Sequence, residues 1–377
     1  MIKLRQKKSP RRKKIWRFST WGQIPIKLQY YYNLKKNGIQ DMEFILFCVS
    51  SGGFFMGNKI LVDKTKNGKV RPWREKKLAS LTYAEYLTIL EFKKAHNVMN
   101  CGDVLQFVKT PSGDLKLYQT WFCHSRLCPL CAWRRSLKNS YEVSKILDTA
   151  KESYESIEFL FLTLTVKNVA LTDLKEELRS IHKSFNKLMK YKRVSNIVLG
   201  YIRSTEITIN REKDEVHPHI HAVLVVPKGY ARRKQLKRYV DIEEWKNLWK
   251  RALKIDYEPV LNIKKIRPKK DSKNRNVKSE LAAAKETAKY QVKSSDYISD
   301  DREKDLKYIE FLENSLSGTR QFGYGGILKD IRHELRLDSK ENEDNLINID
   351  GSLNDEKAID KIMYKWDFKI RNYVSWK

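Results

Sequence analysis

Residues 216–226, VHPHIHAVLVV, constrain the fold more than any other stretch of the 377-residue chain. Side chains alternate between the two faces of a β-strand. As a strand, this segment places His217, His219 and His221 on one face, roughly 7 Å apart along the chain. The other face carries apolar residues. The segment therefore predicts a strand with one face buried in a core and a histidine face available for metal binding. A surface cluster of histidines is the alternative.

A second β-prone segment precedes the histidine strand. Residues 197–209 and 216–226 flank the polar turn REKDE, a pattern typical of a β-hairpin. With the turn centred in that segment, Glu206 lies opposite His219, and directly opposed residues share a face. Glu206 is thus a candidate third ligand, and two acids on the turn are weaker ones. A mixed histidine and carboxylate site suits Mn²⁺ or Mg²⁺ acting on phosphate oxygens.

The segments around the hairpin predict an α+β fold. Strands are expected at 159–166 and 260–266, and helices at 171–191 and 231–253. With the hairpin, the order is β, α, β, β, α, β. This order predicts a ferredoxin-like antiparallel sheet with helices on one face.

An Ala-rich segment at 277–297 contains no Gly or Pro and predicts a further helix. On such a helix Glu286, Tyr290 and Lys293 share a polar face, away from an apolar stripe. A tyrosine needs activation to act as a nucleophile. Lys293 is a candidate to stabilise its phenolate or bind phosphate, and Glu286 is a candidate general base. The alternative is an ordinary packing tyrosine beside a solvated Glu/Lys pair.

Four of the five cysteines cluster in the sequence, and the last two form a CPLC knuckle: Cys101, Cys123, Cys128 and Cys131. This pattern predicts a cysteine-rich segment that binds structural Zn²⁺. His124 and His96 are alternative fourth ligands, and unrelated reduced thiols are the other interpretation.

The charge balance indicates a polyanionic partner. Lys and Arg number 76 against 46 Asp and Glu, a formal net charge of +30. Such an excess costs self-repulsion unless a nucleic acid supplies the countercharge. Three arginines flank the cysteines and are candidate contacts to DNA phosphates: Arg126, Arg134 and Arg135.

No export or membrane signal is apparent. No apolar run approaches the roughly 18 residues of a membrane span, and no apolar stretch follows the basic start of the chain. We expect a cytoplasmic protein with reduced thiols and no membrane partner. The predicted regions are a basic disordered arm (1–20), an unassigned region (21–75), a helical Cys-rich region (76–155), a core (156–300), and an acidic linker with a C-terminal tail (338–377).

Several motifs together resemble a known family, the replication initiators of small Gram-positive rolling-circle plasmids. These belong to the HUH endonucleases, in the single-tyrosine branch. The motifs are FLTLTVKN (161–168), GYIRSTEITIN (200–210), HPHIHAVLVV (217–226) and AKYQVKSSDY (288–297). The segment 123–135 is similar to the family's upstream cysteine motif, and 318–331 to its downstream end. The resemblance spans about residues 75–330 and makes 301–337 a family C-terminal segment.

The resemblance implies a role for each candidate residue at the histidine strand. His219 and His221 match the metal-binding pair, and His217 precedes them. Glu206 stands where a third ligand would lie. The implied fold is an antiparallel ferredoxin-like sheet, the HUH core.

The resemblance also implies a reaction. Tyr290 matches the nucleophile of the YxxK motif, Lys293 its lysine, and Glu286 the acid one turn earlier. Attack on single-stranded origin DNA would give a 5′-phosphotyrosyl enzyme and a 3′-hydroxyl. Host DNA polymerase and helicase are the implied partners, and Glu286 would activate water for termination.

Two rival interpretations keep part of this pattern. A conjugative relaxase or single-strand transposase uses the same site chemistry. A non-enzymatic zinc-containing nucleic-acid-binding protein explains the charge and the cysteines, but not the histidine strand or the YxxK segment.

Overall fold

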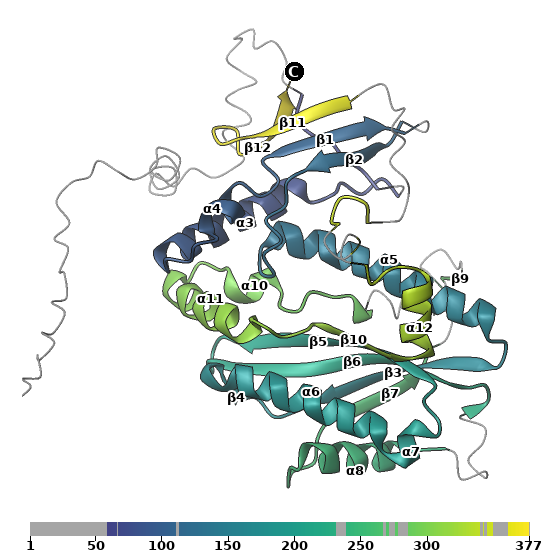
Figure 1. Cartoon of the computed structure of the whole chain (residues 1–377). Coiled ribbons are helices and arrows are strands. Elements are labelled where there is room, and N and C mark those ends of the chain that lie inside the picture. Colours follow the sequence, from purple (N-terminus) through teal and green to yellow (C-terminus); the bar gives the residue numbers. More distant parts are fainter. Residues whose placement is uncertain are drawn as a thin grey trace, which may run out of the picture. The chain divides into compact units, whose positions relative to one another are not determined.

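An antiparallel sheet forms around the histidine strand β6 (Glu215–Pro227), because this strand is long and apolar enough to pair on both edges (Figure 1). The sheet has the order β10-β5-β6-β3-β7, and β4 pairs with the start of β6. The partner strands are β3 (Ile157–Thr165), β4 (Val169–Ala170), β5 (Gly200–Asn210), β7 (Leu261–Lys265) and β10 (Phe322–Gly326). The strands predicted at 159–166, 197–209, 216–226 and 260–266 are thereby confirmed.

The structure is a computed structural model that describes residues 59–65, 67–110, 113–230, 239–266, 269–270, 276–277, 286–339, 342, 345–349 and 361–376. The chain divides into two units after Gly57, and everything described here belongs to the second unit. The predicted basic arm at 1–20 and much of the acidic linker lie outside the described residues.

The chain order within the main sheet is β3, α6 (Leu174–Lys190), β5, β6, α8 (Ile242–Leu253), β7. This is the β-α-β-β-α-β order expected from the sequence. The predicted α+β class with an antiparallel sheet is confirmed. Small elements lie between the main ones: η1 (Leu171–Asp173), α7 (Lys192–Ser195), β8 (Lys269–Lys270) and β9 (Asn276–Val277).

Helices cover both faces of this sheet, not the one face that was predicted (Figure 1). Helices α6 and α8 pack on the face formed by residues such as Leu162 and Leu224. On the other face, α5 (Pro129–Ser153) and α12 (Ile327–Glu334) cover Val223 and Val225. The second half of β6 is apolar at every position, so both of its faces need a covering layer.

The cysteine-bearing region builds a second sheet, with the order β12-β11-β1-β2. Its strands are β1 (Val104–Lys109), β2 (Leu115–Thr120), β11 (Lys361–Asp367) and β12 (Asn372–Trp376). The end of the chain, expected as a tail, thus pairs with β1. The region predicted as helical and Cys-rich at 76–155 begins with two helices, α3 (Trp73–Ile89) and α4 (Ala95–Met99), and Glu91 adopts a positive φ of 58° between them.

The helix predicted at 277–297 is wrong for most of its described part. Val277 belongs to β9, Glu286 and Thr287 are helical, and the helix ends by Ala288. Tyr290 lies in a non-helical segment with bends that leads to α10 (Ser294–Tyr297) and then α11 (Arg302–Leu316). Tertiary contacts override the helix propensity there, since Ile207 N donates to Gln291 O at 2.7 Å and Val292 is buried. Among the described helices, none has the length and apolar character of a membrane span.

Candidate functional site

Three side chains from the β5–β6 hairpin converge on one point. Glu206 pairs with His219 in the strand register, as the sequence predicted. The Oε2 atom of Glu206 lies 3.1 Å from His221 Nε2 and 3.4 Å from His219 Nε2. Ligand atoms bound at about 2.1 Å to one ion stand roughly 3.0–3.4 Å apart. Glu206, His219 and His221 therefore form a group that could hold one metal ion.

The Nδ1 atom of each imidazole, which points away from Glu206, contacts another polar group. His221 Nδ1 lies 3.2 Å from Thr163 Oγ1, and His219 Nδ1 lies 3.3 Å from the carbonyl oxygen of His217. Such contacts fix the orientation of a ligating histidine and leave its other nitrogen for a metal. His217 is outside the group of three and stacks on His219 with ring centroids 5.4 Å apart.

The electrostatics of the group favour an ionised carboxylate. Glu206 is only 6% exposed, and burial alone would raise its pKa. Hydrogen bonds from His219 and His221 outweigh the burial and hold the pKa of Glu206 well below its usual range. Burial, with the charge of His219, lowers the pKa of His217. The carboxylate of Glu206 is thus ionised beside the two imidazoles, as a ligand to a divalent cation must be.

Tyr290 lies in the segment that runs beside Glu206. Gln291 O accepts a hydrogen bond from Ile207 N, one residue after Glu206. The Tyr290 ring lines a small cavity together with Arg126 and Arg135, and Lys76 Nζ lies 6.0 Å from the ring centroid. Burial, then Glu75, raises the pKa of Tyr290 above its usual value, so the resting side chain is a phenol.

The predicted partners of Tyr290 are arranged differently from a shared helix face. Glu286 pairs with Lys289 at the end of the helix, and both side chains are about two-fifths exposed. Lys293 is exposed and interacts electrostatically with Asp296. Asp296 was not predicted: burial raises its pKa and Glu206 adds to the rise, which places it within electrostatic reach of the metal group. Its place in the same motif as Tyr290, three residues after Lys293, could have identified Asp296 as a candidate from the sequence.

The four predicted cysteines come together as one group, with their sulfur atoms within 4.8 Å of one another. Cys131 Sγ lies 3.4 Å from Cys101 Sγ and 3.6 Å from Cys123 Sγ, and Cys101 Sγ lies 3.8 Å from Cys128 Sγ. Four thiolates around Zn²⁺ at about 2.3 Å stand roughly 3.8 Å apart. The group could therefore hold one tetrahedral ion, and neither His96 nor His124 belongs to it.

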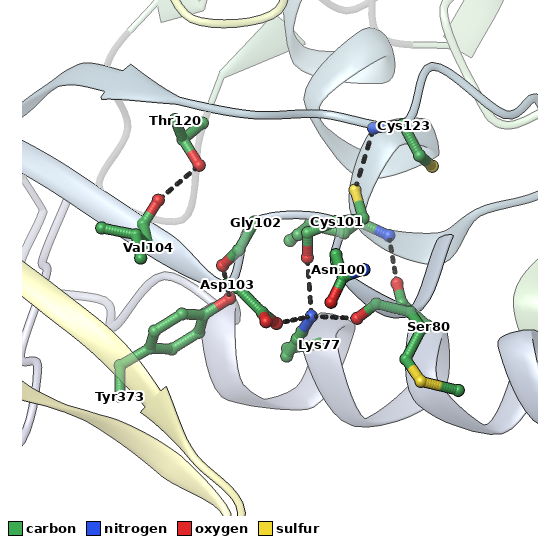
Figure 2. A network of polar contacts seen from close by, with 12 residues as sticks. Lys77, Ser80, Asn100, Cys101, Gly102, Asp103, Val104, Thr120, Cys123 and Tyr373 are labelled. Atoms are coloured by element: carbon green, nitrogen blue, oxygen red, sulfur yellow. Dashed lines mark hydrogen bonds and ion pairs between the residues drawn. The ribbon is translucent and has the colours of Figure 1, made fainter. Parts of the chain in front are cut away.

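A buried lysine supports the loop that carries Cys101 (Figure 2). Lys77 of α3 is 0% exposed, donates to the carbonyl oxygen of Cys101 at 2.8 Å and pairs with Asp103 at 2.6 Å. Tyr373 of β12 donates to Gly102 O at 2.7 Å, and Cys123 N donates to Cys101 Sγ at 3.3 Å (Figure 2). Helix α3, the cysteine loop and the last strand thereby form one supported unit.

Of the three arginines predicted to contact DNA, Arg134 is contradicted. It is 3% exposed, and its guanidinium donates to the carbonyl oxygens of Leu346 and Ile347. Arg126 donates to Leu316 O and Thr319 O, and Arg135 donates to His124 O at 3.1 Å. Both also line the Tyr290 cavity, so these two stay candidates.

A basic groove that the sequence did not predict continues from this cavity. It has a volume of about 600 Å³ and shares Arg126, Arg135 and Gln321 with the cavity of Tyr290. Phe322 and Tyr324 of β10 lie along it with their rings stacked, centroids 6.3 Å apart. Cations and flat rings along one groove are the features that bind single-stranded nucleic acid.

Comparison with known proteins decides the family. The sequence profile of a family described as "Replication protein" matches residues 114–374, well over half of the chain. The chain belongs to this replication-protein family. The match includes three of the four grouped cysteines, the hairpin and Tyr290.

Individual relatives of this replication protein agree with the family. "Protein rep" of Lactiplantibacillus plantarum is 48% identical over 323 residues, which cover 85% of this chain and 100% of the relative. "Protein rep" of Bacillus amyloliquefaciens is 40% identical over 335 residues, 84% of this chain and 97% of the relative. A Staphylococcus aureus "Replication protein" is 36% identical over 242 residues, 63% and 98% of the two chains. No solved structure matches. The family resemblance seen in the motifs is confirmed.

Proposed function

We propose that this replication protein initiates rolling-circle replication of a plasmid by nicking one strand of origin DNA. The observation that carries the proposal is the convergence of His219 Nε2 and His221 Nε2 on one carboxylate oxygen of Glu206. Membership of the replication-protein family supports the proposal. So does the hydrogen bond from Ile207 N to Gln291 O, which brings the Tyr290 segment next to the strand that carries Glu206. A non-enzymatic nucleic-acid-binding role does not explain why His219, His221 and Glu206 meet at one point.

The donor set combines one carboxylate with two imidazoles and could hold a divalent cation. We propose Mn²⁺ or Mg²⁺, because the proposed target is a phosphate oxygen. When bound, such an ion polarises a phosphoryl oxygen. The chain's own residues do the rest. Thr163 and the His217 carbonyl keep both Nε2 atoms turned inward, and Glu206 supplies the negative charge that retains the cation.

Tyr290 is the proposed nucleophile. Its Oη forms a bond to phosphorus, the bond from phosphorus to the 3′ oxygen breaks, and that oxygen takes up a proton. The products are a 5′-phosphotyrosyl enzyme and a 3′-hydroxyl primer for host polymerase. Because the resting side chain is a phenol, its proton leaves during attack, and Lys76, Arg126 and Arg135 around the ring favour the phenolate.

We place the scissile phosphate between the Tyr290 hydroxyl and the metal group, because the phosphate must contact the cation and the attacking oxygen together. The basic groove with Phe322 and Tyr324 then takes the adjoining single strand. Glu286 remains our proposed base for hydrolytic release.

We also propose that the four-cysteine group binds Zn²⁺ and that its role is structural. Three of the four cysteines are buried, and their surroundings are protein side chains and backbone. A closed thiolate site of this kind contributes folding free energy and leaves no ligand position open for catalysis.

Cleavage of an end-labelled single-stranded origin oligonucleotide tests the proposed function. We expect cleavage with Mn²⁺ or Mg²⁺, none with EDTA, and loss of cleavage in His219→Ala. His333→Ala is the matched control, because His333 is exposed and pairs only with Asp338 among the described residues. Metal-independent cleavage, or equal activity in His219→Ala and His333→Ala, would exclude the proposed site.

A further inference from the structure

A second basic cavity lies on the side of the main sheet that α6 covers, away from the histidine group. It has a volume of about 820 Å³ and lies between α6, strand β5 and the loop at residues 317–320. Arg203 of β5 lines it. Because Arg203 is three residues before Glu206 on the same strand, the two side chains point to opposite faces of the sheet. The cavity is thus separate from the metal group.

One face of α6 supplies a straight row of cations to this cavity. The row consists of Lys175, Arg179, Lys183, Lys187 and Lys190. Their spacings of three and four residues keep them on one side of the helix, opposite buried residues such as Leu178 and Phe185. The row spans roughly 22 Å at about 1.5 Å per residue. No Asp or Glu is among the described residues that line the cavity.

Arg203 is a buried cation at the base of the cavity. It is 7% exposed, and the structure gives it no ion-pair partner among the described residues. Its Nη1 donates to Thr205 Oγ1 at 3.3 Å, and Phe185 lies beneath the guanidinium with its centroid 6.0 Å away. Gly323 leaves room for it, because a Cβ at that position would lie 2.9 Å from Arg203 Nε. A buried unpaired charge is costly and indicates that an anion completes the site.

Single-strand recognition does not fit the lining of this cavity. Among the described lining residues there is no Phe, Tyr or Trp, in contrast to the groove with Phe322 and Tyr324. Bases that stack need such rings, whereas backbone phosphates need only cations and polar donors. A rigid helical row of positive charges suits the regular backbone of a duplex.

We propose that this cavity binds backbone phosphates of double-stranded DNA, with Arg203 at its base and α6 along the strand. The protein would then hold duplex DNA on one face of the sheet while the opposite face handles the single strand at the histidine group. That this DNA is the plasmid origin rests on the proposed function. That the cavity binds duplex phosphates rests only on its own lining residues.

The test compares duplex binding of two double variants at several salt concentrations. Arg179→Ala/Lys183→Ala removes two exposed cations that line this cavity and neither of the other two cavities described. Lys93→Ala/Lys369→Ala is the control, because it removes the same charge from exposed sites elsewhere. We expect about tenfold weaker duplex binding, with the slope of log affinity against log salt smaller by about 2, in the first variant. The control should lose less than about twofold in affinity.

Two further measurements separate this inference from its rivals. Cleavage of a short single-stranded oligonucleotide should be unchanged in Arg179→Ala/Lys183→Ala. The cleavage assay therefore tests the proposed nuclease, and the duplex-binding assay tests this cavity independently. Arg203→Met should weaken duplex binding while the free protein becomes no less stable to heat, since it removes an unpaired buried charge. Equal duplex affinity in the two double variants overturns the inference. So does a matching loss of single-strand binding in the first variant.

Discussion

Glu206 lies directly opposite His219 in the β5–β6 hairpin, and its Oε2 atom is 3.4 Å from His219 Nε2. This relationship depends on the register of the hairpin. A shift of one residue would move Glu206 to the face of the sheet that packs on α6. The four residues between the strands therefore determine whether a metal site exists.

Thr163→Val should weaken metal binding without removing a ligand. The hydroxyl of Thr163 is 3.2 Å from His221 Nδ1 and helps to orient the ring. Loss of such a contact costs about 10–100-fold in metal affinity. Titration with Mn²⁺, followed by electron paramagnetic resonance, measures the change.

Thr165→Val is the matched control for this experiment. Thr165 lies on the same strand and face, but its hydroxyl donates to the carbonyl oxygen of Val260. We expect near wild-type Mn²⁺ affinity in that variant. An equal loss in both variants would show that general damage to the strand, and not the orientation of His221, is responsible.

His182 should make stability depend on pH. Burial, then the charge of Arg203, lowers the pKa of His182 to about 4, while its unfolded value is near 6.5. Between these values the unfolded state binds the extra proton, so stability is lost as the pH falls from about 6.5 to about 4. The loss due to this residue is at most about 3 kcal/mol.

Urea denaturation at pH 7 and pH 4.5 measures this effect in the wild type and in His182→Asn. The variant should lose less stability than the wild type between the two pH values, because it has no group to protonate. An identical loss in both proteins would mean that His182 is not buried as a neutral imidazole.

The local part of the fold followed from the sequence because its causes are local. Strand periodicity and a polar turn gave the hairpin, its register and the meeting of Glu206 with His219. The four cysteines were also found, since a CPLC knuckle with nearby cysteines has few other structural uses.

The predictions that were wrong concern segments whose conformation depends on contacts with residues far away in the sequence. Tyr290 lies in a sequence with high helix propensity, but its segment is not helical, and Gln291 O accepts a hydrogen bond from Ile207 N instead of from a helix neighbour. Arg134 is buried by carbonyl groups from Leu346 and Ile347, more than 200 residues later. The pairing of β11 with β1 spans a similar separation. No pattern along the chain reports such contacts.

Purified protein should contain one tightly bound Zn²⁺ per chain at the four-cysteine group. Cys128→Ser should lose the zinc and lower the thermal midpoint, because the metal contributes folding free energy. Ser80→Ala should keep the zinc, since Ser80 Oγ lies 3.4 Å from Cys128 Sγ but offers no thiolate. Elemental analysis and thermal melts measure both. Absence of zinc from the wild type, or an unchanged melt in Cys128→Ser, would contradict this role.

The neighbours Arg134 and Arg135 should separate stability from DNA binding. Arg134→Ala should lower the free energy of unfolding by about 2–4 kcal/mol, because it removes charge-assisted bonds to the carbonyl oxygens of Leu346 and Ile347. Arg135→Ala should change stability by less than about 0.5 kcal/mol and weaken binding of single-stranded DNA. Urea denaturation and fluorescence anisotropy give the two values. If folded Arg134→Ala lost more affinity for single-stranded DNA than Arg135→Ala, then Arg134 and not Arg135 would be the DNA contact.

The covalent adduct between protein and DNA tests the central claim most directly. Tyr290→Phe keeps the ring and removes only the attacking oxygen, and Tyr297→Phe is the control because the Tyr297 hydroxyl is buried and donates to Leu127 O. With a labelled single-stranded origin oligonucleotide and Mn²⁺, wild type and Tyr297→Phe should both give a labelled protein band under denaturing conditions. Tyr290→Phe should give none, although its Mn²⁺ affinity is unchanged. An adduct in Tyr290→Phe at a yield comparable to wild type would contradict the account.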